Sequence, residues 1–379
     1  MAAKSKFSNI MLFEGIIASL FLFVGTYVLA YYFLYYSIIH FFAVASESIK
    51  MIVLAILIFL SISFFLSSLL SHLWDNVFTR GFYMFSGFWL GLFSNLIIAT
   101  GLVWLLIWIF HMTSGEILVW SSVFFAVALG YIIYGTWNAF SPRIKNVEVK
   151  IKNLPDHWQG KKIVQLSDIH LGHVYRAKFM EKIVRETNAL HPEAVVITGD
   201  LFDGMDGNLS DFVEPLNDLE APEGVYFITG NHETYLGAEK SLEVLRRTKV
   251  QNLKDELKNL NGLQLIGINY PERGEHKDVP AIIRSLKNFD PEKPSVLLYH
   301  SPVNISEIEK TGVNLELCGH THRGQIFPYG LITKLVYRGY DYGLHTNGNF
   351  SLYTTTGVGT WGPPARTSNS PEIVHVTLR

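Results

Sequence analysis

Four long, nearly uncharged stretches in the first 140 residues constrain this 379-residue chain more than any other feature. Only eight charged residues occur up to Phe140, against 56 in the remaining 239 residues. About 20 apolar residues are enough for a helix to cross the hydrocarbon core of a bilayer. The sequence therefore predicts about four transmembrane helices followed by a domain with the charge density of a soluble protein. The expected spans are Ile10–Phe42, Met51–Leu70, Gly81–Phe110 and Ile117–Phe140.

Two of these stretches raise further questions. The first is no cleavable signal peptide, because its apolar part is far longer than the roughly 7 to 15 residues of a signal h-region. The third contains Gly87, Gly91, Ser94 and Asn95, where a break could lie, but two spans of about 15 residues would be too short. Glu14, in the first stretch, either binds a proton or an ion or reaches the interface by snorkelling. We expect the second.

The distribution of lysine and arginine around the spans predicts their orientation, because basic residues in short flanks stay in the cytoplasm. Only Lys50 lies on one side. The basic residues on the other side are Lys4, Lys6, Arg80, Arg143, Lys145, Lys150 and Lys152. With an even number of spans, we expect a multi-pass protein of the inner (cytoplasmic) membrane, with both termini and the C-terminal domain in the cytoplasm.

Net charge and cysteine content exclude several classes of protein. The formal net charge is −2, whereas a dedicated binder of nucleic-acid polymers usually carries a basic excess. A single cysteine, Cys318, excludes a disulfide framework and a cysteine-rich zinc site. It ends an apolar run, and we expect it to be a small buried hydrophobe. The sequence carries no signal for an oligomeric state.

After Ser141 and Pro142, short β-branched runs alternate with amphipathic stretches, which is typical of an α/β layer fold. We expect three parts: a transmembrane helical domain at 1–140, a linker with the first strand at 141–159, and an α/β domain at 160–379. The expected strand in the linker is Val147–Ile151.

Five apolar runs of the C-terminal domain end in polar side chains that can bind metals. Ligands bind at the carboxyl edge of the strands in α/β sheets, so five such ends indicate one shared site. Divalent cations accept carboxylate oxygen, amide oxygen and imidazole nitrogen, and a pair of cations needs a ligand that bridges them. The side chains are Asp168 and His170, Asp200, Asn231 with His232 and Glu233, His300, and His320 with His322.

These motifs resemble those of the calcineurin-like metallophosphoesterases. They are D-x-H at Asp168, G-D at Gly199, G-N-H-E at Gly230, the lone His300 and G-H-T-H at Gly319. The resemblance runs from about Lys161 to the C-terminus. It is strongest to the bacterial membrane-associated subgroup, whose pattern continues in Gly324–Pro328, Gly357–Thr360 and Pro363–Arg366. It implies an α/β domain built as a β-sandwich flanked by helices.

The resemblance also implies a dinuclear metal centre. Asp200 would bridge the two cations, and His232 would act as general acid or charge stabiliser. The two implied ligand sets are Asp168, His170, Asp200 and His322 for one cation, and Asp200, Asn231, His300 and His320 for the other. A hydroxide that bridges the cations would attack phosphorus. Mixed oxygen and nitrogen ligation does not distinguish Mn, Zn and Fe.

Three residues near these motifs have two interpretations or depart from the family pattern. Asp203 is expected to cap its loop rather than to bind metal. His173 is expected to be structural, with contact to substrate as the alternative. Arg323 stands where the subgroup more often has glycine, which affects the rim of the pocket and no ligand.

Two features favour a phosphate-bearing lipid as substrate: the short linker to the membrane and an aromatic, basic segment at Ile326–Leu344. That segment suits a membrane interface, and packing on the protein is the equal alternative. We expect a membrane-embedded phosphoesterase acting on a phospholipid, a polyprenyl phosphate or a lipid-linked nucleotide. The alternatives are a phosphodiesterase for soluble nucleotides with the helices as anchor only, and a non-catalytic receptor or scaffold.

Overall fold

A computed structural model describes residues 2–204 and 209–379 of the chain, with side chains from Ala18 onward except that of Leu236. The orientation argument used Lys4 and Lys6, and the snorkelling prediction concerned Glu14. These three side chains lie outside the described residues.

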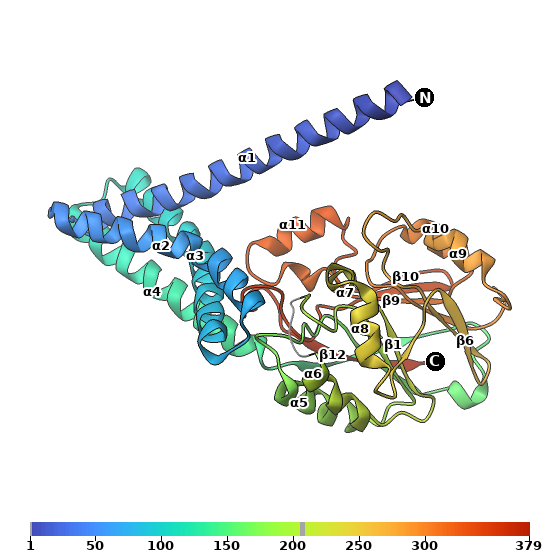
Figure 1. Ribbon diagram of the computed structural model, residues 1–379. Helices are drawn as coiled ribbons and strands as arrows, with labels where there is room; N and C mark the ends of the chain where they lie inside the picture. The colour runs from blue at the N-terminus through green and yellow to red at the C-terminus, as the bar shows by residue number, and fades with distance from the viewer. Residues whose placement is uncertain (1, 205–208) are drawn as a thin grey trace. The chain divides into compact units, whose positions relative to one another are not determined.

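Within the described residues, four helices are long and apolar enough to cross a membrane, as the sequence predicted. They are α1 (Ala2–Phe41), with Ala18–Phe41 as its candidate span, α2 (Glu47–Leu73), α3 (Val77–Phe110) and α4 (Ser114–Ala139), labelled in Figure 1. The third stretch is one unbroken helix, so its internal glycines do not divide it.

The side chain of Glu116 caps the start of α4. Glu116 Oε2 accepts hydrogen bonds from the backbone N–H of Thr113 at 2.8 Å and from its hydroxyl at 2.7 Å. Such capping satisfies donors that the first helical turn leaves free.

At the other end of α4, Pro142 follows the last turn and cannot continue a helix.

The chain forms two compact units. One comprises the chain up to Leu66 together with Trp89–Tyr131, and the other comprises Ser67–Phe88 together with Ile132–Arg379. The second unit therefore contains the C-terminal domain, the turn between α2 and α3, and the last two turns of α4.

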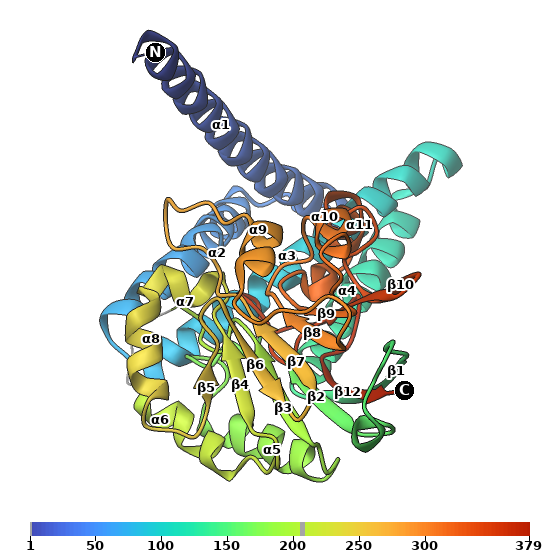
Figure 2. The same ribbon diagram turned by 90° about the vertical axis from the view of Figure 1, so that its right-hand side faces the viewer.

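Two mixed six-stranded sheets form the C-terminal domain (Figure 2). The first has, in spatial order, β1 (Arg143–Val149), β12 (Glu372–Leu378), β2 (Lys162–Leu166), β3 (Ala194–Thr198), β4 (Val225–Ile228) and β5 (Gln251–Asn252). The second has β10 (Gly343–Asn347), β11 (Phe350–Thr354), β9 (Leu315–Cys318), β8 (Ser295–Leu298), β7 (Leu263–Gly267) and β6 (Glu256–Leu260).

Side chains alternate along each strand, and this alternation builds the layers. In β2, Ile163 packs between the two sheets, whereas Val164 packs against the outer helices. In β3, Val196 packs between the two sheets and Val195 packs against the outer helices. Outer helices are α5 (Ala177–Asn188), α6 (Ser210–Val213) and α8 (Ala238–Leu245) on the first sheet, and α9 (Val279–Ser285) and α10 (Ile305–Glu309) on the second. The expected β-sandwich flanked by helices is confirmed.

The first strand of the domain lies at Arg143–Val149, whereas the sequence placed it at Val147–Ile151. It pairs in parallel with Glu372–Leu378 at the end of the chain. The partner strand therefore sets its position, and the hydrophobicity of the linker alone gave no information about that partner.

Candidate metal centre

Five strands from the two sheets deliver the predicted site residues. β2, β3 and β4 are parallel neighbours in one sheet, and β8 and β9 are parallel neighbours in the other. Their carboxyl ends lie at the same edge of each sheet, where ligands bind in α/β folds. The residues are Asp168 and His170 after β2, Asp200 after β3, Asn231 and His232 at the start of α7 (Asn231–Leu236) after β4, His300 after β8, and His320 and His322 after β9.

The backbone is strained at this edge. Asp168, His170, Asp200, His320 and His322 all have positive φ angles, between 47° and 72°. An L-residue in this region costs about 1–2 kcal/mol, because its Cβ approaches the neighbouring carbonyl. Such strain persists where the surrounding structure imposes it, and it is common at functional sites.

Asp168, His170 and His322 form a first buried group whose ligand atoms lie within 4.8 Å of one another. His322 Nε2 lies 3.4 Å from Asp168 Oδ1 and 3.1 Å from His170 Nε2. Asp168 and His170 follow a strand of the first sheet and His322 follows a strand of the second, so this group forms only when the sheets pack together.

Asp200, His300 and His320 form a second group by the same criterion. His300 Nε2 lies 3.2 Å from Asp200 Oδ2, and His320 Nδ1 lies 3.2 Å from His300 Nε2. Asn231 Oδ1 lies 3.1 Å from His300 Nε2, so the amide oxygen joins this group.

Asp200 belongs to the second group and also approaches the first. Its Oδ2 atom is 3.2 Å from His300 Nε2 and 3.9 Å from His170 Nε2. Its Oδ1 atom accepts a hydrogen bond from the backbone N–H of His232 at 2.9 Å. This position fits the bridging role predicted for Asp200.

Asp200 and His300 shift each other's pKa. Burial opposes the charge on Asp200, but the charge and hydrogen bond of His300, with the charges of His232 and His170, outweigh it and lower the pKa. Burial also opposes the charge on His300, but Asp200 raises the pKa of His300 to about 10. Asp200 therefore favours positive charge at His300 Nε2, which a proton or a bound divalent cation can supply.

His232 lies beside both groups, within 4.8 Å of the ligand atoms of His170 and Asp200. Its Nδ1 atom lies 2.9 Å from the backbone carbonyl of Asp203. A carbonyl only accepts, so Nδ1 carries the proton and Nε2 is left for the site. Burial, reinforced by the charge of His170, lowers the pKa of His232 although Asp200 and Asp203 oppose this.

Asp203 orients two histidines at once. Its carbonyl accepts from His232, and its carboxylate Oδ1 lies 3.3 Å from His170 Nδ1. Histidines that bind metals commonly face a carboxylate with their other nitrogen, which fixes the ring. This arrangement favours the expectation that Asp203 supports the loop and is no ligand.

The donor set fits two divalent cations. Two pairs of imidazole nitrogens face each other at 3.1 and 3.2 Å, and bare lone pairs at that distance repel unless a proton or a cation lies between them. Carboxylate, amide and imidazole donors together suit hard to borderline divalent ions.

Sequence reasoning did not assign a role to Glu233, which holds the turns of the site. Its carboxylate accepts from the backbone N–H groups of Gly230 at 2.7 Å, Asp200 at 3.0 Å and Phe202 at 3.0 Å. Burial, with the charge of Asp200, raises the pKa of Glu233 to about 7. The signal was its place in G-N-H-E, three residues into a helix start, where a carboxylate caps free donors.

Arg366 was also missed. It is fully buried, and its guanidinium Nη2 lies 3.0 Å from His322 Nδ1 and donates to the carbonyl of Thr356 at 2.6 Å. Burial lowers the pKa of Arg366 to about 10, so it remains charged near neutral pH. Burial, with the charges of His170 and Arg366, lowers the pKa of His322, which disfavours the protonated form that cannot bind a cation. The sequence signal was Arg366 at the end of P-P-A-R.

His173 contacts the turn between α2 and α3. Its Nδ1 atom lies 3.3 Å from Asp75 Oδ1, and its ring lies 5.9 Å from that of Tyr83. Asp75 also contacts Arg176 and Arg80, at 3.5 and 3.1 Å. This agrees with the structural role expected of His173. Apart from the charge of Asp75, nothing in the sequence indicated this contact.

Residues 161–324 match the sequence family described as calcineurin-like phosphoesterase. An uncharacterized metallophosphoesterase of Helicobacter pylori is 34% identical over 259 residues, covering 67% of this chain and 69% of that protein. One from Aquifex aeolicus is 33% identical over 263 residues, covering 68% and 98%. The chain belongs to the calcineurin-like metallophosphoesterase family.

A third relative, from Danio rerio, is named a transmembrane protein with metallophosphoesterase domain. It is 31% identical over 267 residues, which is 65% of this chain and 60% of that protein. Calcineurin-like phosphoesterases use a dinuclear divalent metal centre, and this chain has groups of side chains suited to hold one. The chain is therefore a metal-dependent phosphoester hydrolase, and its four apolar helices associate it with a membrane.

Proposed function

We infer that this metallophosphoesterase hydrolyses a phosphoester or pyrophosphate bond in a phosphate-bearing lipid, such as a phospholipid, a polyprenyl phosphate or a lipid-linked nucleotide. One observation carries the proposal. Asn138, near the end of α4, donates to the carbonyl of Arg366 at 2.9 Å, and Arg366 contacts the candidate ligand His322. The candidate metal ligand His322 is thus connected through Arg366 to the end of α4, a helix suited to a membrane.

The exposed surface of α11 (Tyr329–Val336) supports the same proposal. Leu331, Leu335 and Val336 are 63%, 80% and 64% exposed. Lys334 lies among them, and such a mixture of apolar and basic side chains suits the boundary between headgroups and acyl chains.

The residues of the site have separate tasks in this proposal. One cation would be held by Asp168, His170, Asp200 and His322, and the other by Asp200, Asn231, His300 and His320. Two divalent cations bound there would lower the pKa of a water molecule and neutralise charge on the phosphoryl oxygens. Asp203 and Arg366 would orient the rings of His170 and His322.

His232 would protonate the leaving oxygen. Hydrolysis adds oxygen to phosphorus and a proton to the leaving group. With Nδ1–H donating to the carbonyl of Asp203, the ring offers Nε2 to the substrate. A protonated ring would give that proton to the leaving oxygen.

The proposal includes the arrangement in the membrane. It treats residues 1–140 as the membrane domain, 141–159 as linker and first strand, and 160–379 as the catalytic domain. The catalytic domain lies on the cytoplasmic side of the inner membrane. The contact of Asp75 with His173 supports the even number of spans, since the turn between α2 and α3 then shares a side with the catalytic domain.

The test is hydrolysis by the purified full chain in detergent. Short-chain phospholipids, a polyprenyl phosphate and a lipid-linked nucleotide are assayed beside cyclic nucleotides and dinucleotides. We expect a higher kcat/KM for at least one lipid than for every soluble substrate. Turnover confined to the nucleotides would replace the proposal with a soluble-substrate phosphodiesterase. Stoichiometric metal without any turnover would favour a receptor or scaffold.

A further inference from the structure

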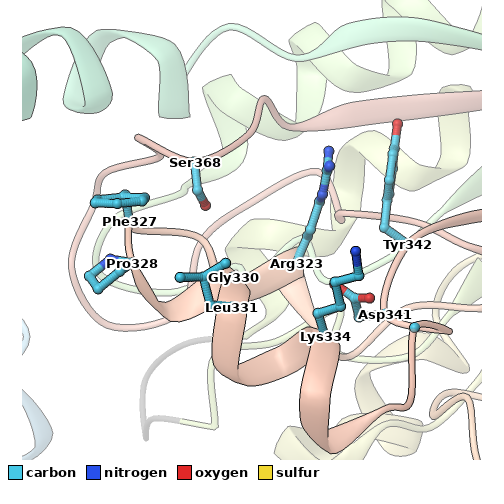
Figure 3. A pocket seen from close by; sticks show the side chains of 10 residues that line it. Arg323, Phe327, Pro328, Gly330, Leu331, Lys334, Asp341, Tyr342 and Ser368 are labelled. Carbon is cyan, nitrogen blue, oxygen red and sulfur yellow. The ribbon is translucent and has the colours of Figure 1, made fainter.

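A pocket of about 390 Å³ lies beside the candidate metal centre, outside the residues assigned so far. We name it the Arg323 pocket, and the lining residues that matter here are Arg323, Phe327, Leu331, Lys334, Asp341 and Tyr342. In Figure 3, Arg323 runs alongside the ring of Tyr342, and Phe327 lies on the opposite side. This volume is typical of pockets for small ligands.

The pocket adjoins the loop that carries two candidate ligands. Arg323 directly follows His322. The hydroxyl of Thr321 donates to the carbonyl of Asp341 at 2.6 Å, and the ring of Tyr337 lies 6.1 Å from that of His320. A substrate held at the candidate metal centre therefore has the Arg323 pocket within reach.

Arg323 occupies a backbone position that favours glycine. Its φ and ψ angles are 48° and 36°, in the left-handed region, where the Cβ of an L-residue is crowded. Its guanidinium carbon lies 4.4 Å from the centre of the Tyr342 ring. A residue that accepts strain in order to place a charge in a pocket is a candidate for function.

Tyr342 keeps this charge in place. Its hydroxyl donates to Glu372 Oε2 at 3.3 Å, and Glu372 also accepts from the hydroxyl of Tyr353 at 2.9 Å. Glu372 is buried, so the ring over which Arg323 lies is fixed to the end of the sheet. The guanidinium is thereby pre-organised before a ligand binds.

The lining of the pocket is cationic on one side and apolar on another. Arg323 and Lys334 carry two positive charges against the single carboxylate of Asp341. Phe327 and Leu331 are 44% and 63% exposed and continue the apolar surface of α11. A guanidinium recognises phosphate through paired donors, and an apolar wall accepts hydrocarbon.

We propose that the Arg323 pocket binds a second phosphate of the substrate, so that the preferred substrate is a phosphorylated amphiphile with two anionic groups. This inference rests on the proposed function and extends it, because it places one phosphate at the metal centre and the other against Arg323. The hydrocarbon part lies along Phe327 and Leu331.

The test compares two probes that differ by one phosphate: geranyl monophosphate and geranyl diphosphate. Their Kd values for the metal-loaded full chain in detergent are measured by calorimetry, for wild type, Arg323→Gly and Lys334→Gln. We expect wild type to prefer the diphosphate. Arg323→Gly lowers this preference about tenfold, the effect of losing one hydrogen bond to a charged group. Lys334→Gln lowers it as well.

The matched control is Arg338→Ala, which removes an exposed charge from the same segment outside the pocket. We expect it to keep the wild-type preference. Arg323→Gly relieves a strained position, so its Tm should not fall below that of wild type, which excludes misfolding as the cause.

An unchanged preference in Arg323→Gly, or an equal loss in Arg338→Ala, would overturn the inference. Hydrolysis of bis(p-nitrophenyl) phosphate by wild type is measured in parallel. Its absence, together with a lowered preference in Arg323→Gly, would reject the proposed hydrolysis and leave the phosphate pocket standing.

Discussion

Asp200 is the residue at which the two groups of candidate ligands meet. Its Oδ2 atom lies 3.2 Å from His300 and 3.9 Å from His170, so its charge acts on both. We predict that Asp200→Asn lowers kcat at least about 100-fold and lowers metal content. Mutating a residue that only hydrogen-bonds to a metal ligand already costs about 10–100-fold in metal affinity or activity, and Asp200 is itself a candidate ligand. Atomic absorption and turnover check this. The control is Asp218→Asn, an exposed carboxylate of the same domain.

The geometry is compatible with two roles for His232, metal ligand and proton donor, because His232 lies beside His170 and Asp200 as a ligand would. We predict that His232→Ala lowers kcat by about 10²–10⁴-fold through loss of proton transfer, while the metal content stays at the wild-type level. Loss of metal in this variant would make His232 a ligand instead. His276→Ala, in an exposed loop, is the matched control.

Glu316 interrupts the apolar run of β9 and is fully buried. One carboxylate oxygen accepts from Cys318 at 3.3 Å, and the other has no hydrogen-bond partner among the described residues. Burial raises the pKa of Glu316 to about 8. The folded protein therefore keeps this group neutral at pH values where the unfolded chain ionises it.

The sign of the pH dependence follows. A raised folded-state pKa gives stability that is complete below the unfolded value of 4.5 and is lost as the pH rises toward about 8. We predict that Glu316→Gln removes this loss and gains on the order of 2–3 kcal/mol, or about 5–10 °C in Tm, at pH 8 relative to pH 5. Thermal melts at both pH values measure it. Parallel Tm curves for variant and wild type would contradict it.

At the scale of elements, the end of α4 is joined to the loop that supports the metal centre. Asn138 donates to the carbonyls of Arg366 at 2.9 Å and Asn369 at 2.7 Å, and Gly135 accepts from the backbone N–H of Arg366 at 2.8 Å. A Cβ at Gly135 would lie 2.5 Å from Thr367, so only glycine lets the loop approach this closely.

We predict that Asn138→Ala lowers stability by about 1–3 kcal/mol, because it removes the donor from one buried and one partly buried carbonyl. Metal affinity should fall by about 10-fold or more as Arg366 and His322 lose their support. Chemical denaturation and metal titration measure the two effects. Ser122→Ala, exposed on the same helix, should change neither. An unaltered metal affinity in Asn138→Ala would show that α4 only anchors the domain.

At the scale of the whole molecule, four apolar helices and an α/β domain define a membrane-bound hydrolase. The loop between α2 and α3 contacts the catalytic domain through Asp75, so this loop and the end of α4 share one side. Arg80, Arg143 and Lys145 lie on that side, and by the positive-inside tendency this distribution favours the proposed cytoplasmic orientation.

We predict that a C-terminal green fluorescent protein fusion is fluorescent in bacterial cells and that a C-terminal alkaline phosphatase fusion is inactive. Alkaline phosphatase folds only where its disulfides form, so it reports exposure outside the cytoplasm. An active phosphatase fusion would invert the orientation. A phosphatase fusion in the loop after α1 should be active and serves as the control.

The four spans could be predicted from the sequence because an apolar run of 20 or more residues is satisfied in a bilayer by a helix alone, with all backbone hydrogen bonds made locally. The ligand motifs could be predicted because each follows its own strand by a residue or two, as Asp200 follows β3. Both patterns are local. The strand of the linker was predicted to start four residues too late and to end two residues too late, because its partner lies at Glu372–Leu378.

What supports the ligands was decided only by the tertiary structure. Arg366 is 44 residues from His322, and Asp75 is 98 residues from His173, so neither contact leaves a spacing that can be recognised in the sequence. The Arg323 pocket likewise depends on how α11 packs against His322–Gly324. The sequence by itself determined which side chains are candidates for binding metal. The packing of two sheets and the end of a membrane helix decided how those atoms are held, because such contacts depend on distance in space and not along the chain.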